Sequence, residues 1–407
     1  MATAAAPAPA ARLAPVLEPR ADAPSLLPIS SPSDYDADAP LAAPENSTSA
    51  SLVETSAPSS APAAANAGPL LVIGIPTLRR ANDPDYVLRT LTYLSEQLDA
   101  AGAVTGSVFP LRVRVVVLDN TRDGDSHAAF VNARVRTCAA ASAPCTTSNV
   151  RIGAYEYETV FVGGLGVDAR FLFSRNGRPR VADGDDAGNA NVPGARVRAQ
   201  ARDVADLLAL SHGVWGERMD FYMFLEDDFR VCPSALRALA YGIARATEEH
   251  ASPPWNALRV SFGLNGGVLR GGDVPTLSAY LREHAARRPP DHLWVEWFAG
   301  EKVQSAAHKG GRPHVAFRYN LLEHFGRASS LRAEPQGVYA YCYDELNENV
   351  VFEVEAYKRS VCGHDDVWPC WPMGDPRYPA LAEPGLDFEA LAKSSRETTV
   401  QNFQEQG

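Results

Sequence analysis

The chain has 407 residues, with 38 Lys and Arg side chains against 49 Asp and Glu side chains, and a formal net charge of −11 at pH 7. This acidic balance argues against a nucleic-acid-binding protein, because such proteins gather positive charge for the phosphates. No apolar run approaches the ~20 residues that a transmembrane helix needs, so we expect no membrane span in this chain.

The first 68 residues differ in composition from the rest of the chain. Ala and Pro dominate them, and Tyr35 is their single aromatic residue. Such a segment cannot bury a core, so we expect residues 1–68 to form a disordered arm; a transit peptide or an N-terminus that lacks its anchor is the alternative. The remainder divides into a main domain over residues 69–335, a Cys- and Trp-rich extension packed on it over residues 336–379, and a polar, loosely held tail over residues 380–407.

After residue 68 the sequence shows the pattern of a βαβ unit. Leu70–Ile75 and Val113–Leu118 are apolar runs typical of buried strands. Between them, Asp83-Pro84 is a helix-start signal, followed by apolar residues on one helical face. This order predicts an α/β fold with a mostly parallel sheet flanked by helices.

The alternation of helices and strands continues along the chain. In order, we expect a surface loop over residues 174–194, a helix over Val197–Leu210, strands over Met219–Leu225 and Leu258–Phe262, a helix capped by Asp273 and a strand over Val315–Phe317. The strand Met219–Leu225 is apolar at nearly every position. Such a strand is typical of the sheet centre, where helices cover both faces.

Three consecutive carboxylates, Glu226, Asp227 and Asp228, follow directly after this central strand. Ligands bind at the carboxyl ends of strands in open α/β sheets, and clustered carboxylates repel one another unless a cation neutralises them. Oxygen ligands suit Mg²⁺ or Mn²⁺, which substrate phosphates usually share. The alternative is a solvated acidic turn, or Asp228 as the cap of a helix over Ser234–Ala244.

Cationic side chains accompany the carboxylates. Arg79 and Arg80 follow the first strand, and Arg198 and Arg202 lie four residues apart on the helix before the acidic segment. Arginines hold a diphosphate through charge-assisted hydrogen bonds, although any single one has an ordinary surface role as its alternative. A nucleotide diphosphate bridged by a metal ion to the carboxylates accounts for them together.

All six cysteines lie beyond residue 68, and none forms a C-x-x-C pattern. An even count is compatible with disulfides, and Cys138 and Cys145 are spaced to close a short loop. Buried free thiols of a cytosolic protein are the alternative.

The segment Phe224–Asp228 resembles the acidic metal motif of Golgi glycosyltransferases with the GT-A fold. Over about residues 70–331 the chain resembles, more specifically, the N-acetylglucosaminyltransferase IV family and its GPI-glycan-modifying relatives. The similar blocks are Gly74–Thr77, Val197-Arg198 with Arg202 and Asp206, Leu225–Asp228, Phe262–Leu269, Pro290–Leu293, and Phe317-Arg318 leading to His324–Leu331. The last block, H-x-G-x-x-S-S-L, is the most specific.

This resemblance implies a GT-A-like, Rossmann-type sheet and an inverting, metal-dependent transfer of a sugar from a UDP-sugar to a glycan hydroxyl. N-acetylglucosamine is the first expectation for the sugar, and the Golgi or secretory lumen for the location. Asp228 and His324 would bind Mn²⁺ or Mg²⁺. The nucleotide sugar would contact Thr77, Arg79, Arg198, Arg202, Glu226 and Asp227.

The chain also departs from the family pattern. About 75 residues follow Leu331, too few for the lectin-like C-terminal domain of the glucosaminyltransferases, and no anchor is visible. The acceptor therefore stays open. A catalytically silent glycan-binding protein on the same fold is the alternative function. A phosphotransferase is a weaker one, because the chain has no G-x-x-x-x-G-K-[ST] loop.

Inverting transfer needs a base that takes the proton of the attacking hydroxyl. Asp291 and Glu296 are the candidates, and Asp291 matches the family block. Glu296 lies between Trp294 and Trp297, which we expect to stack on sugar faces and to raise the pKa of Glu296 by desolvation. The alternatives are a helix cap for Asp291 and a solvent-facing position for Glu296.

Overall fold

A computed structural model of the chain describes residues 68–80, 84–121, 124, 126–141, 143–179, 193–326, 340–376 and 385–405. All of these residues belong to one structural unit. The expected arm lies outside the described residues, except for Gly68. In the part of the chain that the structure describes, no helix has the length and hydrophobicity to cross a membrane.

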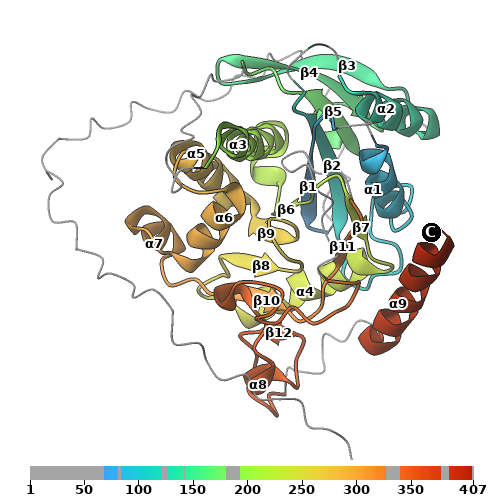
Figure 1. The fold of residues 1–407 in the computed structure, drawn as a ribbon. Coiled ribbons are helices and arrows are strands. Elements are labelled where there is room, and N and C mark those ends of the chain that lie inside the picture. The colour runs from blue at the N-terminus through green and yellow to red at the C-terminus, as the bar shows by residue number, and fades with distance from the viewer. Residues whose placement is uncertain are drawn as a thin grey trace, which may run out of the picture. The chain divides into compact units, whose positions relative to one another are not determined.

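A ten-stranded mixed sheet runs through the unit in the order β12-β10-β8-β9-β6-β1-β2-β5-β4-β3 (Figure 1). Its strands are β1 (Leu70–Thr77), β2 (Arg112–Asp119), β3 (Thr146–Ile152), β4 (Tyr155–Val162), β5 (Phe171–Arg175), β6 (Phe221–Phe224), β8 (Ala257–Arg259), β9 (Gly267–Arg270), β10 (His314–Phe317) and β12 (Val367–Trp368). The four central strands, β6, β1, β2 and β5, are parallel. The expectation of a mostly parallel sheet holds for this centre, whereas β4, β9 and β12 add antiparallel pairings on both sides.

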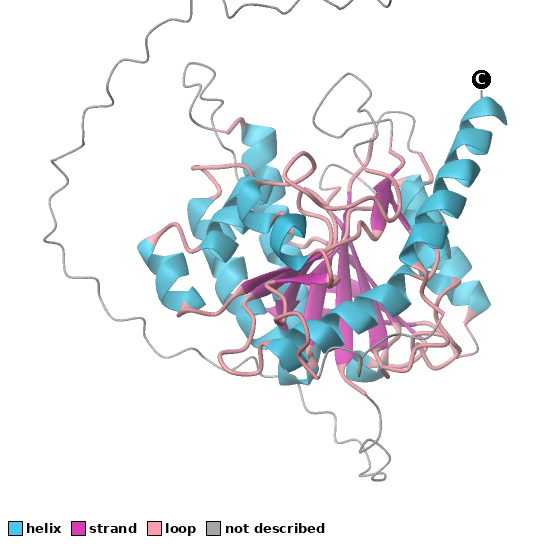
Figure 2. Ribbon diagram, turned by 90° about the horizontal axis from the view of Figure 1, so that it is seen from below, coloured by secondary structure: helices cyan, strands magenta, loops and turns pink. Residues whose placement is uncertain are grey.

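Helices cover both faces of the sheet (Figure 2). The helices of the described residues are α1 (Tyr86–Ser95), α2 (Ala128–Ala140), α3 (Ala195–Trp215), α4 (Ala235–Glu249), α5 (Val274–His284), α6 (Pro290–Ala299), α7 (Val303–Lys309), α8 (Arg359–Cys362) and α9 (Phe388–Glu405). The core under α1, α2 and α4 is separate from the core under α3, α5 and α6. Successive residues of β1, such as Val72 and Ile73, enter opposite cores, so the strand is apolar at nearly every position.

The expected βαβ unit is confirmed as β1, α1 and β2, and the expected central strand is β6. The helices expected after residues 197 and 273 are α3 and α5, and the short strands expected near residues 258 and 315 are β8 and β10. The hairpin of β3 and β4 was not predicted. Most residues of β3 are exposed, so its sequence carries no apolar signal.

The order of the central strands reverses at β1. Helix α1 leads from β1 to β2 on one face, whereas α3 leads from β5 back to β6 on the other face. In open α/β sheets, ligands bind at the carboxyl ends of the strands where the order reverses. The residues that follow β1 and β6 therefore form the expected binding edge.

Three disulfides pair all six cysteines: Cys138–Cys145, Cys232–Cys342 and Cys362–Cys370. The first closes the short loop that the spacing suggested, and the alternative of free thiols was wrong. The second joins the main domain to the extension, and β12 of the extension pairs with β10 of the central sheet.

The tail is more ordered than its polar composition suggested. It contains α9, whose first residue, Phe388, stacks on Tyr319 with ring centroids 4.5 Å apart. Near its middle, Arg396 pairs with Asp344 of the extension. The described residues of α9 therefore contact both the main domain and the extension.

Candidate functional site

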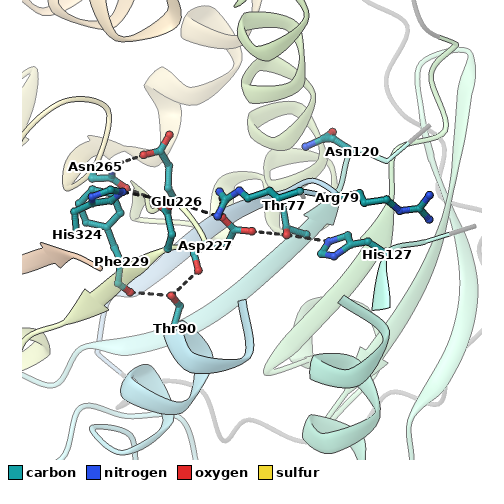
Figure 3. A network of polar contacts seen from close by, with 12 residues as sticks. Thr77, Arg79, Thr90, Asn120, His127, Glu226, Asp227, Phe229, Asn265 and His324 are labelled. Atoms are coloured by element: carbon teal, nitrogen blue, oxygen red, sulfur yellow. Dashed lines mark hydrogen bonds and ion pairs between the residues drawn. The ribbon is translucent and has the colours of Figure 1, made fainter. Parts of the chain in front are cut away.

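A hydrogen bond joins the ends of β1 and β6 at the point where the strand order reverses (Figure 3). The hydroxyl of Thr77, the last residue of β1, donates to Oδ2 of Asp227 at 2.5 Å, and both residues are buried. Nε2 of His127, beside the first turn of α2, lies 3.0 Å from the same hydroxyl. Since the hydroxyl hydrogen goes to Asp227, His127 is the donor in this second contact.

Two side chains hold the backbone of the acidic segment in place (Figure 3). The hydroxyl of Thr90, from α1, lies 2.8 Å from the carbonyl oxygens of both Asp227 and Phe229. Asn265 accepts the amide N–H of Glu226 at 2.6 Å and donates to Oε2 of Glu226 at 2.8 Å. The carboxylates are therefore fixed by residues from α1 and from the turn between β8 and β9.

Arg80 is the cation that contacts the carboxylates. Its Nη2 lies 2.5 Å from Oδ1 of Asp227, and its Nη1 lies 3.3 Å from Oδ2 of Asp228. The guanidinium also lies over the ring of Tyr86 at 5.0 Å, and only 10% of the side chain is exposed. Arg79, the neighbour expected to bind nucleotide, is exposed and extends away from Asp227 (Figure 3).

Asp228 and His324, which the sequence proposed as metal ligands, lie together although 96 residues separate them. Nε2 of His324, at the end of β11 (Leu322–His324), is 3.3 Å from Oδ2 of Asp228. This strand pairs with β7 (Phe229–Val231), so His324 lies opposite Phe229 and packs on its ring. A Cβ atom on Gly326 would lie 2.3 Å from Oδ2 of Asp228, so the chain approaches this carboxylate closely only because residue 326 is glycine.

The three carboxylates differ in their proton affinity. Burial, with the charge of Asp228 next, raises the pKa of Glu226 to about 7. Burial also raises the pKa of Asp227, although Arg80 opposes this effect. For Asp228 burial favours the neutral form, but the hydrogen bond with His324 and the charge of Arg80 outweigh it and lower its pKa. Asp228 is therefore the group that keeps its negative charge most readily.

The described residues contain no group of three or more His, Cys, Asp or Glu side chains that could hold a metal ion. Asp228 nevertheless has an oxygen that could bind a metal ion, because its Oδ1 is buried with no hydrogen-bond partner in the described parts. A carboxylate oxygen and an imidazole nitrogen suit Mn²⁺ or Mg²⁺, which take further ligands from phosphates and water. Asp228 and His324 thus fit a divalent ion that a phosphate ligand helps to hold.

A second polar group follows β2 and β5. Nδ2 of Asn176 donates to Oδ1 of Asn120 at 2.8 Å and to Oδ2 of Asp206 at 3.1 Å, and all three residues are buried. Asp119, the last residue of β2, accepts the N–H of Thr121 at 2.9 Å through Oδ1. Its Oδ2 is buried with no partner among the described side chains and backbone groups.

Asp119, Asn120 and Asn176 were not predicted as site residues. The signal for them in the sequence is the run Asp119-Asn120-Thr121 directly after the second apolar strand, which parallels the acidic run after β6. Asp206, part of the similar blocks, is held by Arg178 and Arg282, each with a nitrogen 2.7 Å from its Oδ1.

The two arginines expected on α3 lie in its first two turns. Arg198 is buried and donates to the carbonyl oxygen of Pro193 at 2.8 Å. Arg202 is half-buried, one turn before Asp206. Because α3 begins after the carboxyl end of β5, both residues lie toward the edge of the sheet that carries Asn176.

The two candidate bases differ sharply in their surroundings. Glu296 is fully buried in α6, where Tyr280 and Arg287 donate to its carboxylate and Arg288 lies 3.1 Å away. Burial alone would raise its pKa, but the hydrogen bonds from Arg287 and Tyr280 outweigh it, and the pKa of Glu296 lies below its ordinary value.

The flanking tryptophans, Trp294 and Trp297, are also fully buried, in the core under α6. Neither can stack on a sugar. The expectation of sugar-stacking tryptophans and a raised pKa was therefore wrong, as was the alternative of a solvent-facing Glu296.

Asp291, in contrast, is half-buried in the first turn of α6. It is not the helix cap, because Pro289 occupies that position; its Oδ1 accepts the N–H of His292 at 2.9 Å. Burial raises the pKa of Glu355, which pairs with Arg259, and the negative charge of Asp291 adds to this effect. The carboxylate of Asp291 is therefore partly accessible to solvent, on the side of α6 that faces the extension.

The chain matches no protein-family model, and none of the curated proteins is detectably similar to it.

Proposed function

We propose that the chain is an inverting, divalent-metal-dependent glycosyltransferase that moves a sugar from a UDP-sugar to a hydroxyl of a glycan acceptor. N-acetylglucosamine is the first choice for the sugar. One observation carries the proposal: Asp227 is bonded to Thr77 where the strand order reverses, and the adjacent Asp228 keeps a buried carboxylate oxygen free of hydrogen bonds among the described residues. An α/β sheet binds nucleotides at this place.

The polar residues after β2 and β5 suit the nucleoside. A carboxylate near a strand end is a natural acceptor for ribose hydroxyls in nucleotide-binding sheets. Asp119 has such an unused oxygen, and Asn120 and Asn176 are held beside it by their mutual hydrogen bond. A uridine whose N–H or ribose hydroxyl donates to Asp119 would satisfy this buried oxygen.

The diphosphate then lies toward Asp228, His324 and Arg80. A metal ion bound by Asp228 and His324 would supply positive charge to the leaving diphosphate. Arg80 already lies at the carboxylates, so a short side-chain movement brings its guanidinium to a neighbouring phosphate. Arginine favours such contacts because its planar group donates two parallel hydrogen bonds.

Asp291 is the base in this proposal. It is a carboxylate with partial solvent access, whereas Glu296 is fully buried and engaged by Arg287. A base must reach the attacking hydroxyl of the acceptor, so its partial exposure favours Asp291 over the fully buried Glu296. A location in the secretory pathway agrees with the three disulfides, which form and persist in oxidising compartments.

A donor screen tests the proposal directly. Purified protein is incubated with a panel of nucleotide sugars and Mn²⁺, and the released nucleotide is measured with and without a mixed glycan array as acceptor. We expect acceptor-dependent release of UDP from one UDP-sugar, and loss of release in EDTA. Glycan binding with no nucleotide binding in calorimetry, with or without Mn²⁺, would instead identify a silent glycan-binding protein.

A further inference from the structure

A pocket of about 460 Å³ lies between the C-terminal half of α1, strand β7 and the start of α4. The residues that define its chemistry are Tyr93, Glu96, Thr105, Arg230, Ser234 and Arg237. Its volume falls in the range of about 300–1,000 Å³ that is typical of small-molecule sites. None of these residues takes part in the candidate active site described above.

The ladder of β7 and β11 separates this pocket from the acidic cluster. Successive residues of a strand point to opposite faces. Phe229 and His324, which are paired across the ladder, contact each other on the side of Asp228. The next pair, Arg230 and Glu323, therefore points to the other side, where Arg230 lies over the ring of Tyr93 at 5.7 Å.

Arg230 is a largely buried cation whose hydrogen-bonding capacity is not used up. Its side chain is 17% exposed, and its Nε is buried without a hydrogen-bond partner among the described residues. The carboxylate of Glu323 lies 3.9 Å from its Nη1, which is longer than a hydrogen bond. A guanidinium has five N–H donors, and buried donors without acceptors are costly. An acceptor from a ligand would remove that cost.

A second cation and several hydroxyl groups complete the lining. Arg237, on the first turn of α4, lines the pocket beside Gly106. Tyr93, Thr105 and Ser234 bring hydroxyl groups, and Ser234 makes no side-chain cap to the helix. Glu96 adds an exposed carboxylate at the rim. Two arginines favour an anionic group, whereas the hydroxyls and the carboxylate favour a ligand that also carries hydroxyl donors.

We propose that this pocket binds a small polyhydroxylated anion, a sugar that carries a phosphate or a carboxylate group, with the anionic group at Arg230 and Arg237. The proposal does not rest on glycosyl transfer, because the pocket lies on the other side of the ladder from Asp228. Glu96 and the hydroxyls of Tyr93 and Thr105 would then contact the sugar hydroxyls.

The test is a calorimetric titration of the full chain at low ionic strength with glucose 6-phosphate, glucuronate, inorganic phosphate and glucose, each in the presence of excess UDP. We expect saturable one-site binding of glucose 6-phosphate or glucuronate, the stronger of the two identifying the anionic group. Inorganic phosphate should bind more weakly, and glucose should not bind. Added salt should weaken the binding. Absence of saturable binding by both sugar anions would overturn the proposal.

Two variants locate the binding. Thr105→Glu adds a negative charge at an exposed position of the lining, and Arg237→Met removes one cation; each should weaken binding at least tenfold without loss of the fold. The matched controls are Thr105→Ser and Arg136→Met, the latter an exposed arginine on α2. Both controls should bind as the wild type does. Unchanged affinity in folded Thr105→Glu and Arg237→Met would place the anion elsewhere and refute the site.

Discussion

The hydroxyl of Thr77 donates a 2.5 Å hydrogen bond to Asp227, and this contact ties the end of β1 to the acidic segment after β6. The two residues are 150 positions apart in the chain. Arg80, three residues after Thr77, binds the other oxygen of the same carboxylate. The last residue of β1 therefore supplies a neutral donor to Asp227, and the loop after β1 supplies a charged one, so the site depends on how β1 and β6 are paired.

Thr77→Val should destabilise the fold. The substitution keeps the shape of the side chain but leaves a buried carboxylate oxygen without its donor, which costs about 1–3 kcal/mol. Urea unfolding measures the effect, and Thr77→Ser, which keeps the hydroxyl, should stay close to the wild type. A Thr77→Val protein as stable as the wild type would mean that the bond to Asp227 contributes nothing to the fold.

Asp228→Asn should nearly abolish sugar transfer and Mn²⁺-dependent nucleotide binding. The change removes the carboxylate whose pKa is held low by His324 and Arg80. Loss of one preorganised electrostatic group typically costs about 10²–10³ in kcat. Initial rates and calorimetry measure both effects, with the exposed Asp387→Asn as the control. Wild-type rates in folded Asp228→Asn would remove this residue from the site.

Gly326→Ala should reduce activity more than stability. The added Cβ would come within 2.3 Å of Oδ2 and 2.7 Å of Cβ of Asp228, so either the carboxylate or the chain after β11 has to move. A displacement of about 1 Å at a reacting site can cost about 10² in rate. Gly272→Ala is the control, because no heavy atom lies within 4 Å of its added Cβ. Equal rates for the two variants would show that the close approach at Gly326 has no functional role.

Much of the site could be predicted from the sequence because an apolar run and the carboxylates directly after it both indicate a ligand-binding strand end. The apolar run before Glu226 predicts a central strand, and the carboxyl end of such a strand is a ligand edge whatever its neighbours are. The His324 prediction came from a resemblance rather than from a physical signal. The structure places this histidine against Asp228.

The features that were missed depend on tertiary packing. Glu296 has a tryptophan on either side in the sequence, but α6 buries both rings and the carboxylate together and supplies Arg287 as the partner. Arg80 was grouped with Arg79 because they are adjacent, yet only Arg80 turns toward Asp227. Adjacent residues of an irregular segment point in different directions, and no periodicity reveals which one faces the site.

Asp291→Asn should lower the rate of transfer, whereas Glu296→Gln should lower the stability of the fold. If Asp291 is the base, its amide keeps the contact with His292 but cannot take a proton, so transfer should fall about 10²-fold or more while donor binding and stability persist. Glu296→Gln weakens a buried ion pair with partly exposed arginines, so stability should fall by about 1–3 kcal/mol. Its rate per folded molecule should change little. Wild-type turnover in Asp291→Asn would exclude it as the base, and a large rate loss in a stable Glu296→Gln would reverse the assignment.

His314 should make the fold acid-sensitive. Its ring packs edge-on against Phe298 with centroids 5.2 Å apart, and both ring nitrogens are buried with no hydrogen-bond partner in the described residues. Burial, together with the charges of Arg259 and Lys309, lowers its pKa from 6.5 to about 3. As the pH falls below about 6.5, the unfolded chain therefore takes up a proton that the folded chain refuses.

The contribution of His314 to stability is complete above about pH 6.5 and is lost as the pH falls from there toward 3. The loss should reach up to about 1.4 kcal/mol per pH unit in this range. His314→Phe keeps an aromatic ring on Phe298 and removes the titrating group. The free energy of unfolding, measured by urea between pH 7 and pH 5, should therefore decline less steeply in His314→Phe than in the wild type. Parallel declines in the two proteins would mean that the folded state accepts the proton on His314 as readily as the unfolded state does.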